Sequence, residues 1–261
     1  MMLTDKVAVV YGAGGAIGGA VARAFAAQGA EVFATGRDLA AVEKVTGEIV
    51  FLGGRAKAAE VDALDEVAVQ AHLQSVVEQS GRVDVSFNAI GIPDERVVGV
   101  SLAELDAARF ALPIASYTTS YFLTARAAAR HMIANRSGVI MTVSALPART
   151  GTALNGGYGS AMAAKEALTR DLSAELAPHG IRVVGLRPHG LPETPTMREV
   201  HALKTPQLSY EQFEGFLAGS THPKRVMRLD EVASVAAFLA SDGASGMTGT
   251  TVNLTMGSLD D

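Results

Sequence analysis

Short runs of β-branched and apolar residues alternate with longer segments of helical period along the whole chain. The first unit consists of a run at Val7–Tyr11, a predicted helix over about 17–28 and a second run at 31–35. Further strands are predicted at 58–61, 83–88, 139–143, 182–186 and 251–254, and each is preceded by enough chain for a crossover helix. This order predicts an α/β fold: a doubly wound parallel sheet with helices on both faces, in one domain over residues 1–261.

The composition narrows the classes of protein and ligand that this chain can represent. Hydrophobic residues make up 48% of the 261 residues and charged residues 19%, which suits a compact, enzyme-like fold. The formal charge of -5 and the lack of a long Lys and Arg run favour a small-molecule partner over nucleic acid. With no cysteine, disulfides and thiolate metal sites are excluded, and we expect no metal. No apolar stretch has the length of a membrane span or of a signal peptide, which predicts a cytoplasmic protein.

The segment 188–228 interrupts the alternation of strands and helices. After Pro188 it contains four more prolines, around one short amphipathic stretch at 210–217. Long irregular insertions in compact domains are usually functional, so we expect a lid or a substrate loop here. The alternative is a solvated surface excursion.

A glycine-rich stretch follows the first predicted strand directly and opens the first predicted helix. It has the sequence Gly12-Ala13-Gly14-Gly15-Ala16-Ile17-Gly18. Small residues let the backbone approach a pyrophosphate, and the free N–H groups and positive dipole end of a helix meet its charge. Between a strand and a helix of one βαβ unit, this stretch predicts a dinucleotide site. The alternative is a tight turn without a ligand.

This stretch resembles the G-x-x-x-G-x-G loop of the short-chain dehydrogenase/reductase family, with Gly12 and Gly18 at the outer positions and Ala16 in place of the middle glycine. Asn88-Ala89-Ile90-Gly91 is similar to the family's N-A-G turn. Further blocks occur in the family's order: Glu166-Ala167-Leu168-Thr169-Arg170, His179-Gly180-Ile181-Arg182-Val183, Phe238-Leu239-Ala240-Ser241-Asp242 and Thr248-Gly249. The resemblance implies a Rossmann-fold enzyme that uses NAD or NADP and forms a homo-oligomer, a tetramer or a dimer.

The coenzyme is expected to contact residues from several strand ends. From the glycine stretch and the resemblance, the expected binding residues are Gly12, Gly14, Gly15, Ile17, Gly18, Arg37, Asp62, Asn88, Ala89, Gly91, Pro188 and Thr194. Asp62 is placed beside the adenine, and Thr194 near the nicotinamide amide. Arg37 after the second strand favours the 2′-phosphate of NADP, and Thr35 agrees, since an acidic residue there would favour NAD. Asp38 is the counter-evidence, although it can instead cap the next helix.

The catalytic positions depart from the family pattern of Asn, Ser, Tyr and Lys. Tyr158 resembles the catalytic tyrosine, but the lysine four residues later is replaced by Met162. The serine position falls on Ala145, so Ser144 beside it is the candidate for the orienting hydroxyl, and the asparagine position falls on Tyr117. Without the lysine, Tyr158 should titrate nearer ~10 and be a poor base, but it could still donate a proton.

Two other residues could supply the missing positive charge. Lys165 follows Tyr158 by seven residues, on nearly the same helix face, and its side chain leans back towards the helix N-terminus. This spacing also resembles the enoyl reductase branch of the superfamily, although the downstream register differs. The alternative is that Lys165 extends to solvent or to a subunit interface. His189, after Pro188, could transfer a proton near the coenzyme, or it could be a core or surface histidine.

These observations favour an NADP-preferring oxidoreductase that reduces a small or medium apolar carbonyl or a conjugated enone. Tyr158 would be the proton donor, with Ser144 and Lys165 as the other catalytic candidates. A nucleotide-binding subunit without redox turnover is the rival hypothesis, because three catalytic positions are altered. An isomerase or dehydratase that uses the same pocket is the third.

Overall fold

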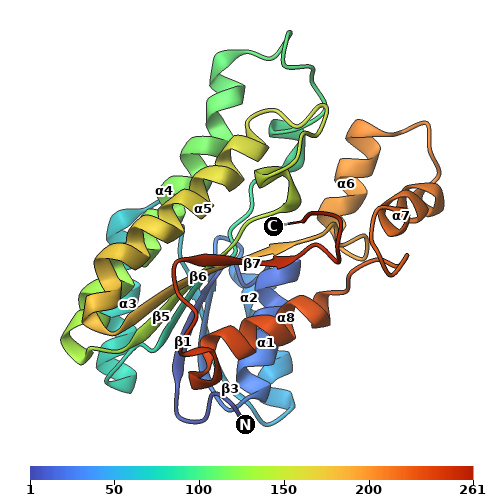
Figure 1. The fold of residues 1–261 in the computed structure, drawn as a ribbon. Coiled ribbons are helices and arrows are strands. Elements are labelled where there is room, and N and C mark those ends of the chain that lie inside the picture. Colours follow the sequence, from blue (N-terminus) through green and yellow to red (C-terminus); the bar gives the residue numbers. More distant parts are fainter. Residues whose placement is uncertain (261) are drawn as a thin grey trace.

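The computed structural model describes residues 1–260 and contains one sheet of seven strands (Figure 1). All neighbouring strands are parallel, in the order β3-β2-β1-β4-β5-β6-β7. The strands are β1 (Val7–Tyr11), β2 (Glu31–Gly36), β3 (Arg55–Glu60), β4 (Val85–Asn88), β5 (Gly138–Val143), β6 (Ile181–Pro188) and β7 (Thr250–Leu254). The predicted doubly wound parallel sheet is therefore confirmed.

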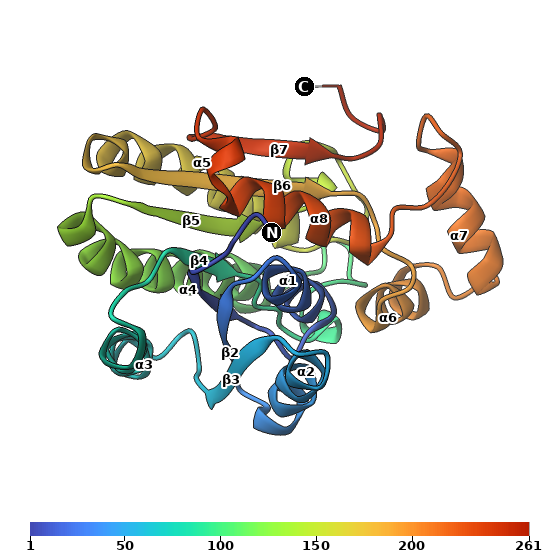
Figure 2. The same cartoon turned by 90° about the horizontal axis from the view of Figure 1, so that it is seen from below.

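Helices cover both faces of this sheet, as Figure 2 shows. Helices α1 (Ala16–Ala27), α2 (Leu39–Phe51) and α8 (Leu229–Ala240) pack on one face, and α3 (Glu66–Ser80), α4 (Ala107–Asn135) and α5 (Tyr158–Leu176) on the other. Short 3-10 helices are η1 (Asp94–Arg96), η2 (Leu146–Ala148), η3 (Ala177–His179) and η4 (Asp242–Ala244). Each face has its own core, with Phe25 and Phe87 edge to face on one side and Leu73 and Tyr121 on the other.

Burial explains which strand boundaries the sequence locates. Every residue of β1 is buried, since this strand lies between two others, and its bounds agree with the apolar run. Strand β3 lies at the sheet edge and begins at Arg55, three residues before the predicted start. Exposed and partly buried residues alternate along its first half, where Arg55 and Lys57 are exposed, because an edge strand keeps one side in water. The apolar pattern therefore identifies only its second half.

The segment 188–228 contains two helices rather than one amphipathic stretch. Helix α6 (Pro195–Lys204) was not predicted, since Pro195 was assigned to an irregular, proline-containing loop. Proline is favoured at the first position of a helix, and here the Thr194 side chain caps α6 by accepting from the Met197 N–H. Helix α7 (Tyr210–Gly219) covers the amphipathic stretch at 210–217, and it begins with a capping box formed by Ser209 and Gln212.

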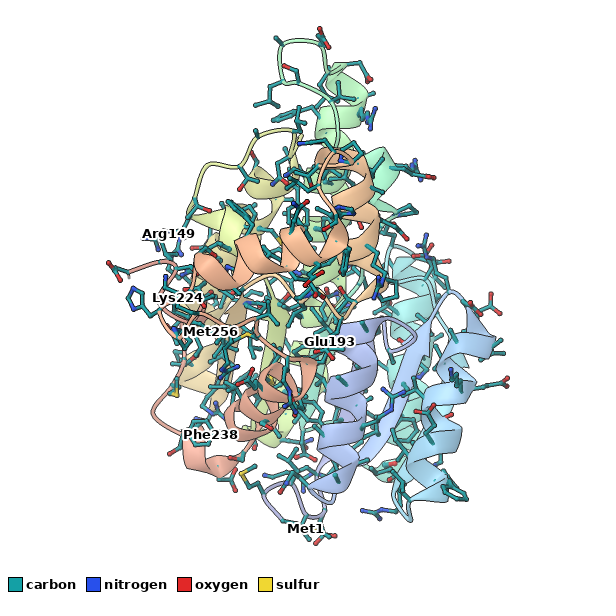
Figure 3. The ribbon with its side chains drawn as sticks, turned by 90° about the vertical axis from the view of Figure 1, so that its right-hand side faces the viewer. Met1, Arg149, Glu193, Lys224, Phe238 and Met256 are labelled. Carbon is teal, nitrogen blue, oxygen red and sulfur yellow. The ribbon has the colours of Figure 1, made fainter. Side chains whose placement is uncertain are left out.

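Helices α6 and α7 form a lobe beyond the carboxyl ends of the strands (Figures 1 and 3). Glu193, labelled in Figure 3, precedes α6, and its carboxylate accepts a hydrogen bond from the Leu229 N–H at the start of α8, with 2.5 Å between the two atoms. This bond ties the two ends of the lobe together. Within residues 1–260, no helix combines the length and the apolarity needed to cross a bilayer.

Candidate functional site

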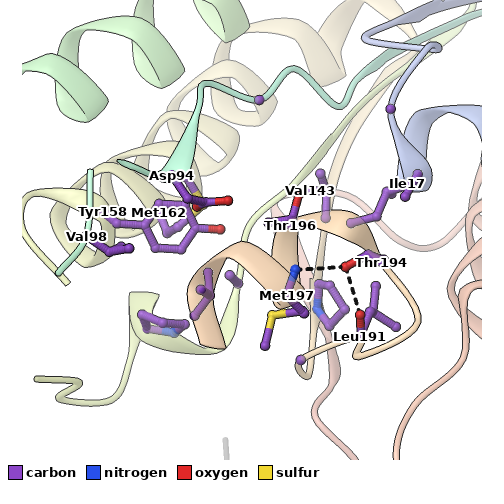
Figure 4. Close-up of a pocket in the computed structure, with 18 of the residues that line it drawn as sticks. Ile17, Asp94, Val98, Val143, Tyr158, Met162, Leu191, Thr194, Thr196 and Met197 are labelled. Carbon is purple, nitrogen blue, oxygen red and sulfur yellow. Dashed lines mark hydrogen bonds between the residues drawn. The ribbon is translucent and has the colours of Figure 1, made fainter. Parts of the chain in front are cut away.

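A cavity of about 1090 Å³ opens at the carboxyl ends of the strands. Its walls come from the turns after β1, β2, β3, β4, β5 and β6, from the start of α5 and from the α6–α7 lobe (Figure 4). In an open parallel sheet, ligands bind in the crevice outside the carboxyl ends of the strands, where the strand order reverses. Here the order reverses between β1 and β4, so the cavity lies at the expected place.

The glycine loop forms one end of this cavity. Gly12 has a positive φ of 78°, and a Cβ atom there would lie 2.5 Å from the carbonyl oxygen of Ala89. Gly14, Gly15 and Ile17 line the cavity. Gly15 caps α1 with no side chain, so the first N–H groups of the helix stay open to a ligand. The loop therefore fits the pyrophosphate of a dinucleotide.

Gly18 packs against the back of this loop. It is not among the residues that line the cavity in the described part of the chain. A Cβ atom at Gly18 would lie 2.2 Å from the Gly12 carbonyl oxygen, so glycine is required for the helix to pack against the turn. Gly18 therefore shapes the turn by packing, and its contact with the coenzyme stays a prediction.

The turn after β2 and the turn after β3 place Arg37 and Asp62 in the cavity wall. Asp38 accepts a hydrogen bond from the Ala41 N–H (3.2 Å) and caps α2, which confirms the capping role expected for it. Thr35 is fully buried, and its hydroxyl lies 3.4 Å from the Val10 carbonyl oxygen. The buried Thr35 side chain therefore gives no evidence on the choice of coenzyme. The expected preference for NADP rests on Arg37 alone.

Two further coenzyme candidates have side chains that are engaged elsewhere. The Asn88 side chain donates to the Thr124 hydroxyl (3.1 Å) inside the fold, so the turn after β4 reaches the cavity through Ala89 and Gly91 instead. Pro188 and Thr194 line the cavity as expected. The Thr194 hydroxyl, however, donates to the Leu191 carbonyl (2.8 Å) and caps α6, as the dashed lines in Figure 4 show.

Two tyrosines lie together in the cavity wall. Tyr158 is the first residue of α5, and its ring meets that of Tyr117 on α4 edge to face, with 5.7 Å between the centroids. The Tyr117 hydroxyl accepts from the Ile92 N–H (3.4 Å). Burial raises the pKa of Tyr158 well above its ordinary value, and Tyr117 and Asp94 add to the effect. Tyr158 therefore keeps its proton at neutral pH and can act as a proton donor.

Lys165 lies about two turns after Tyr158 on α5 and lines the same cavity. Only 1% of it is exposed, and its Nζ donates to the Val143 carbonyl (2.7 Å) at the end of β5. The alternative in which it extends to solvent is therefore wrong. Its Nζ lies 5.8 Å from the ring centroids of both Tyr117 and Tyr121. Burial lowers the pKa of Lys165 to about 7. Met162, at the family's lysine position, is buried beside Tyr158 in the same wall (Figure 4).

Ser144 takes part in a buried ionic network. Its hydroxyl donates to Glu166 Oε1 (2.7 Å), and Glu166 accepts two hydrogen bonds from Arg187, at 2.7 and 2.8 Å. The carboxylate and guanidinium side chains are only 5% and 3% exposed. The predicted role of Ser144 as the orienting hydroxyl conflicts with this arrangement, because the hydroxyl would have to leave a charged acceptor.

His189 is buried and lines the cavity, with its Nε2 3.0 Å from the Ser220 hydroxyl at the end of α7. Burial lowers the pKa of His189 below its ordinary value. The imidazole is therefore neutral at neutral pH. Its contact with the Ser220 hydroxyl connects the end of β6 to the α6–α7 lobe.

Two charged residues of the cavity wall have no sequence motif and were missed. Asp94 on η1 is buried, and burial together with Glu199 raises its pKa to about 6. Lys204, at the end of α6, points its Nζ to the Asn155 side-chain oxygen (3.3 Å), and burial lowers its pKa. Neither position matches a family block, so the sequence carried no signal for them.

Comparison with known proteins gives relatives over nearly the full chain. A family model described as enoyl-(acyl carrier protein) reductase matches residues 12–258. The chain is 34% identical over 245 residues to a cis-4-hydroxycyclohexanecarboxylate dehydrogenase of Sinomonas cyclohexanicum, covering 94% of this chain and 93% of the relative. It is 30% identical over 260 residues to 3-oxoacyl-(acyl-carrier-protein) reductase of Escherichia coli strain K12, with 98% of each chain covered. The crystal structure of an NAD⁺-bound xylitol dehydrogenase superposes with a TM-score of 0.88 at 26% identity, covering 97% of this chain and 99% of that one.

Proposed function

Since this chain belongs to the short-chain dehydrogenase/reductase family, we propose that it reduces a small or medium apolar carbonyl compound or conjugated enone, with NADPH as the preferred coenzyme. The observation that carries the proposal is the shared cavity. The glycine loop lines one end of it, and Tyr158 and Lys165 enter its wall from a single helix.

The residues that would hold the coenzyme follow from the cavity wall. The glycine loop and the open end of α1 would take the pyrophosphate, Arg37 the 2′-phosphate, and Asp62 the adenine side. When bound, the reduced nicotinamide supplies the hydride. The residues of this chain must then provide a proton, exclude water and orient the substrate.

Tyr158 would provide the proton, because its raised pKa keeps the phenol protonated until a developing alkoxide accepts from it. As the proton leaves, negative charge appears on the phenol oxygen. Lys165 is buried on the same helix, seven residues after Tyr158. In its protonated form, its positive charge would stabilise the developing phenolate. In this proposal Lys165 replaces the lysine that Met162 has displaced.

The substrate would lie between the tyrosine pair and the α6–α7 lobe. The wall there is largely apolar, formed by Ile92, Val98, Leu191, Met197, Phe213, Phe216 and Leu217. Phe216 is 71% exposed although it borders the cavity. We therefore interpret residues 188–228 as the cover over the substrate.

The proposal also includes the cytoplasmic location expected from the sequence. It includes a homo-oligomer, a tetramer or a dimer, as expected from the family resemblance.

The proposal is tested first by coenzyme titration and turnover. The chain has no tryptophan, so binding of NADPH or NADH can be followed by reduced-nicotinamide fluorescence with little protein background. Oxidation of NADPH is then followed with a panel of apolar ketones and enones. Binding without turnover would favour the rival nucleotide-binding subunit, and absence of binding to either coenzyme contradicts both.

Replacement of Tyr158 by Phe is expected to lower kcat for the best ketone by at least about 100-fold, because the general acid is removed. NADPH affinity should not change. Tyr121→Phe is the matched control, since it removes another buried tyrosine hydroxyl, bonded to Thr169 at 3.1 Å, outside the cavity wall. Equal kcat in Tyr158→Phe and wild type would remove Tyr158 from the mechanism.

Replacement of Arg37 by Ala is expected to weaken NADPH binding about tenfold and to leave NADH affinity nearly unchanged, because only NADPH carries the 2′-phosphate. Fluorescence titration of both coenzymes measures the ratio of the two dissociation constants. Arg55→Ala is the control, since this exposed arginine starts β3 at the opposite end of the sheet. Parallel losses for NADPH and NADH would mean that Arg37 does not recognise the phosphate.

A further inference from the structure

Asp94 is a buried carboxylate in the wall of the cavity, on the 3-10 turn between β4 and α4. Only 9% of it is exposed. Among residues 1–260, no side chain forms a hydrogen bond or an ion pair with its carboxylate. Figure 4 shows the carboxyl group beside the hydroxyl end of Tyr158, with both pointing into the cavity. The carboxyl group therefore faces the cavity, where it is available to a group inside it.

The turn that carries Asp94 is held in place by the protein. Arg109 on α4 donates to the carbonyls of Glu95 (2.6 Å) and Val98 (3.0 Å). The Val97 and Val98 N–H groups close the turn on the Asp94 carbonyl, at 2.8 and 2.9 Å. These bonds hold the backbone of the turn, and with it the Cα atom of Asp94, at the cavity wall.

The titratable groups whose charges act together with that of Asp94 come from three elements. They are Tyr117 on α4, Tyr158 on α5 and Glu199 on α6. Burial raises the pKa of Asp94 to about 6, and the charge of Glu199 adds to this. Burial also raises the pKa of both tyrosines, and the negative charge of Asp94 contributes to each. The charge on Asp94 therefore acts on Tyr158, and the pKa values of both groups are raised.

The proposed reduction leaves Tyr158 without its proton after each turnover. Tyr117 and Met162 occupy the positions from which the family's asparagine and lysine would support a proton relay. A buried phenolate is costly, so the next cycle requires a nearby proton source. In the described part of the chain, Asp94 is the carboxyl group that lines the cavity beside Tyr158.

We propose that Asp94 returns the proton to Tyr158 and so connects the active tyrosine to the water at the cavity mouth. When the substrate oxygen takes the phenolic proton, the O–H electron pair stays on Tyr158 as phenolate. Since no hydrogen bond joins the two groups directly, the Asp94 carboxylic acid gives its proton to this phenolate through a water molecule in the cavity and becomes a carboxylate, which then takes a proton from the water at the cavity mouth. Asp94 therefore acts on the substrate through Tyr158 and is a relay residue. This step rests on the proposed function.

The kinetic test separates the first turnover from the later ones. At pH 6, with NADPH and the best ketone of the panel, Asp94→Asn should complete its first turnover at the wild-type rate. Its steady-state kcat should fall about tenfold, because Tyr158 is reprotonated slowly. Glu95→Gln is the control, since this exposed carboxylate lies on the same turn. Equal first-turnover and steady-state rates in Asp94→Asn would overturn the proposal.

Failure of this proposal can be told apart from failure of the proposed function. If Tyr158→Phe abolishes the first turnover while Asp94→Asn keeps the wild-type steady state, only the relay is wrong. If Tyr158→Phe turns over normally, the proton donor is wrong and the relay fails with it.

A second readout needs no substrate. The carboxyl carbon of Asp94, followed by ¹³C NMR in the unliganded protein, should titrate at about pH 6. Glu199→Gln removes a negative charge, which favours the carboxylate, so the midpoint should move to lower pH. An Asp94 midpoint at the ordinary value of 3.8, unmoved by Glu199→Gln, would show that this carboxyl holds no proton to deliver near neutral pH.

Discussion

Lys165→Met is expected to lower kcat/KM for carbonyl reduction about 100-fold. The proposed role requires the cation to come within about 6 Å of the developing phenolate, where at an effective dielectric of about 20 it would stabilise the charge by about 3 kcal/mol, which corresponds to this factor. The loss should appear in NADPH oxidation with the best ketone. Because burial lowers the pKa of Lys165 to about 7, the wild-type rate should fall as pH rises through this value. Lys165→Met should lack this descending limb.

The double variant Met162→Lys with Lys165→Met tests whether the charge or its position matters. It moves the cation one turn along α5, to the family's usual place, without adding a second buried charge. If the cation is what the site lacks, the double variant should recover at least about tenfold over Lys165→Met. Full activity in Lys165→Met alone would contradict the role that we propose for this lysine.

Stability gives an independent check that Lys165→Met is folded, with a definite sign. The pKa of Lys165 is lowered from 10.5 to about 7, so between these values the unfolded chain binds a proton that the folded chain does not. The free energy of unfolding therefore rises with pH in this window, and the burial cost is fully present below pH 7. We expect Lys165→Met to raise the unfolding free energy by about 1–3 kcal/mol at pH 6, with a smaller gain towards pH 10. Urea unfolding at both pH values measures this difference.

Arg187→Met is expected to lower the free energy of unfolding by about 3–5 kcal/mol, because it leaves the Glu166 carboxylate buried without its guanidinium. For a chain of this size, the melting temperature should fall by roughly 10 °C or more. Differential scanning calorimetry measures the change. Arg225→Met is the matched control, since its ion pair with Glu231 is exposed and should contribute less than about 1 kcal/mol.

A double variant distinguishes a stranded charge from a loss of packing. Glu166→Leu with Arg187→Met replaces the buried ion pair by apolar side chains and should recover most of the lost stability. If the double variant is as unstable as Arg187→Met, the network stabilises the fold by more than the pairing of its charges.

The fold could be predicted because its signals are local and repeat along the chain. The run Val7–Tyr11 is apolar throughout, since a central strand is buried on both faces, and its bounds are confirmed. Asp38 could be identified as a cap from its place before a helical pattern. Strand β3 was only half detected because an edge strand mixes charged and apolar residues. Helix α6 was missed because Pro195 has opposite meanings inside a helix and at its first turn.

The site could be predicted only where a residue acts through its backbone or its place in a motif. The glycine loop and Tyr158 are of this kind. Ser144, Glu166 and Arg187 come from the turn after β5, from α5 and from β6, so nothing in their spacing indicates that they meet. Whether Lys165 turns inwards depends on the Val143 carbonyl, a group common to every residue. Asp94 carries no signal, because its importance comes from burial next to residues far away in sequence.

The cavity has two parts that differ in how they are held. Its floor is held by the Ser144–Glu166–Arg187 network, and its roof is formed by the α6–α7 lobe. The network fastens the ends of β5 and β6 to α5 beneath the catalytic residues, so a change there alters stability and chemistry together. The roof is the α6–α7 lobe, whose ends are tied by Glu193 and whose inner residues include Met197 and Leu217. Substitutions in the roof can reshape the space for the substrate at little cost to the floor. A new substrate specificity could therefore arise in this chain without loss of the fold that supports catalysis.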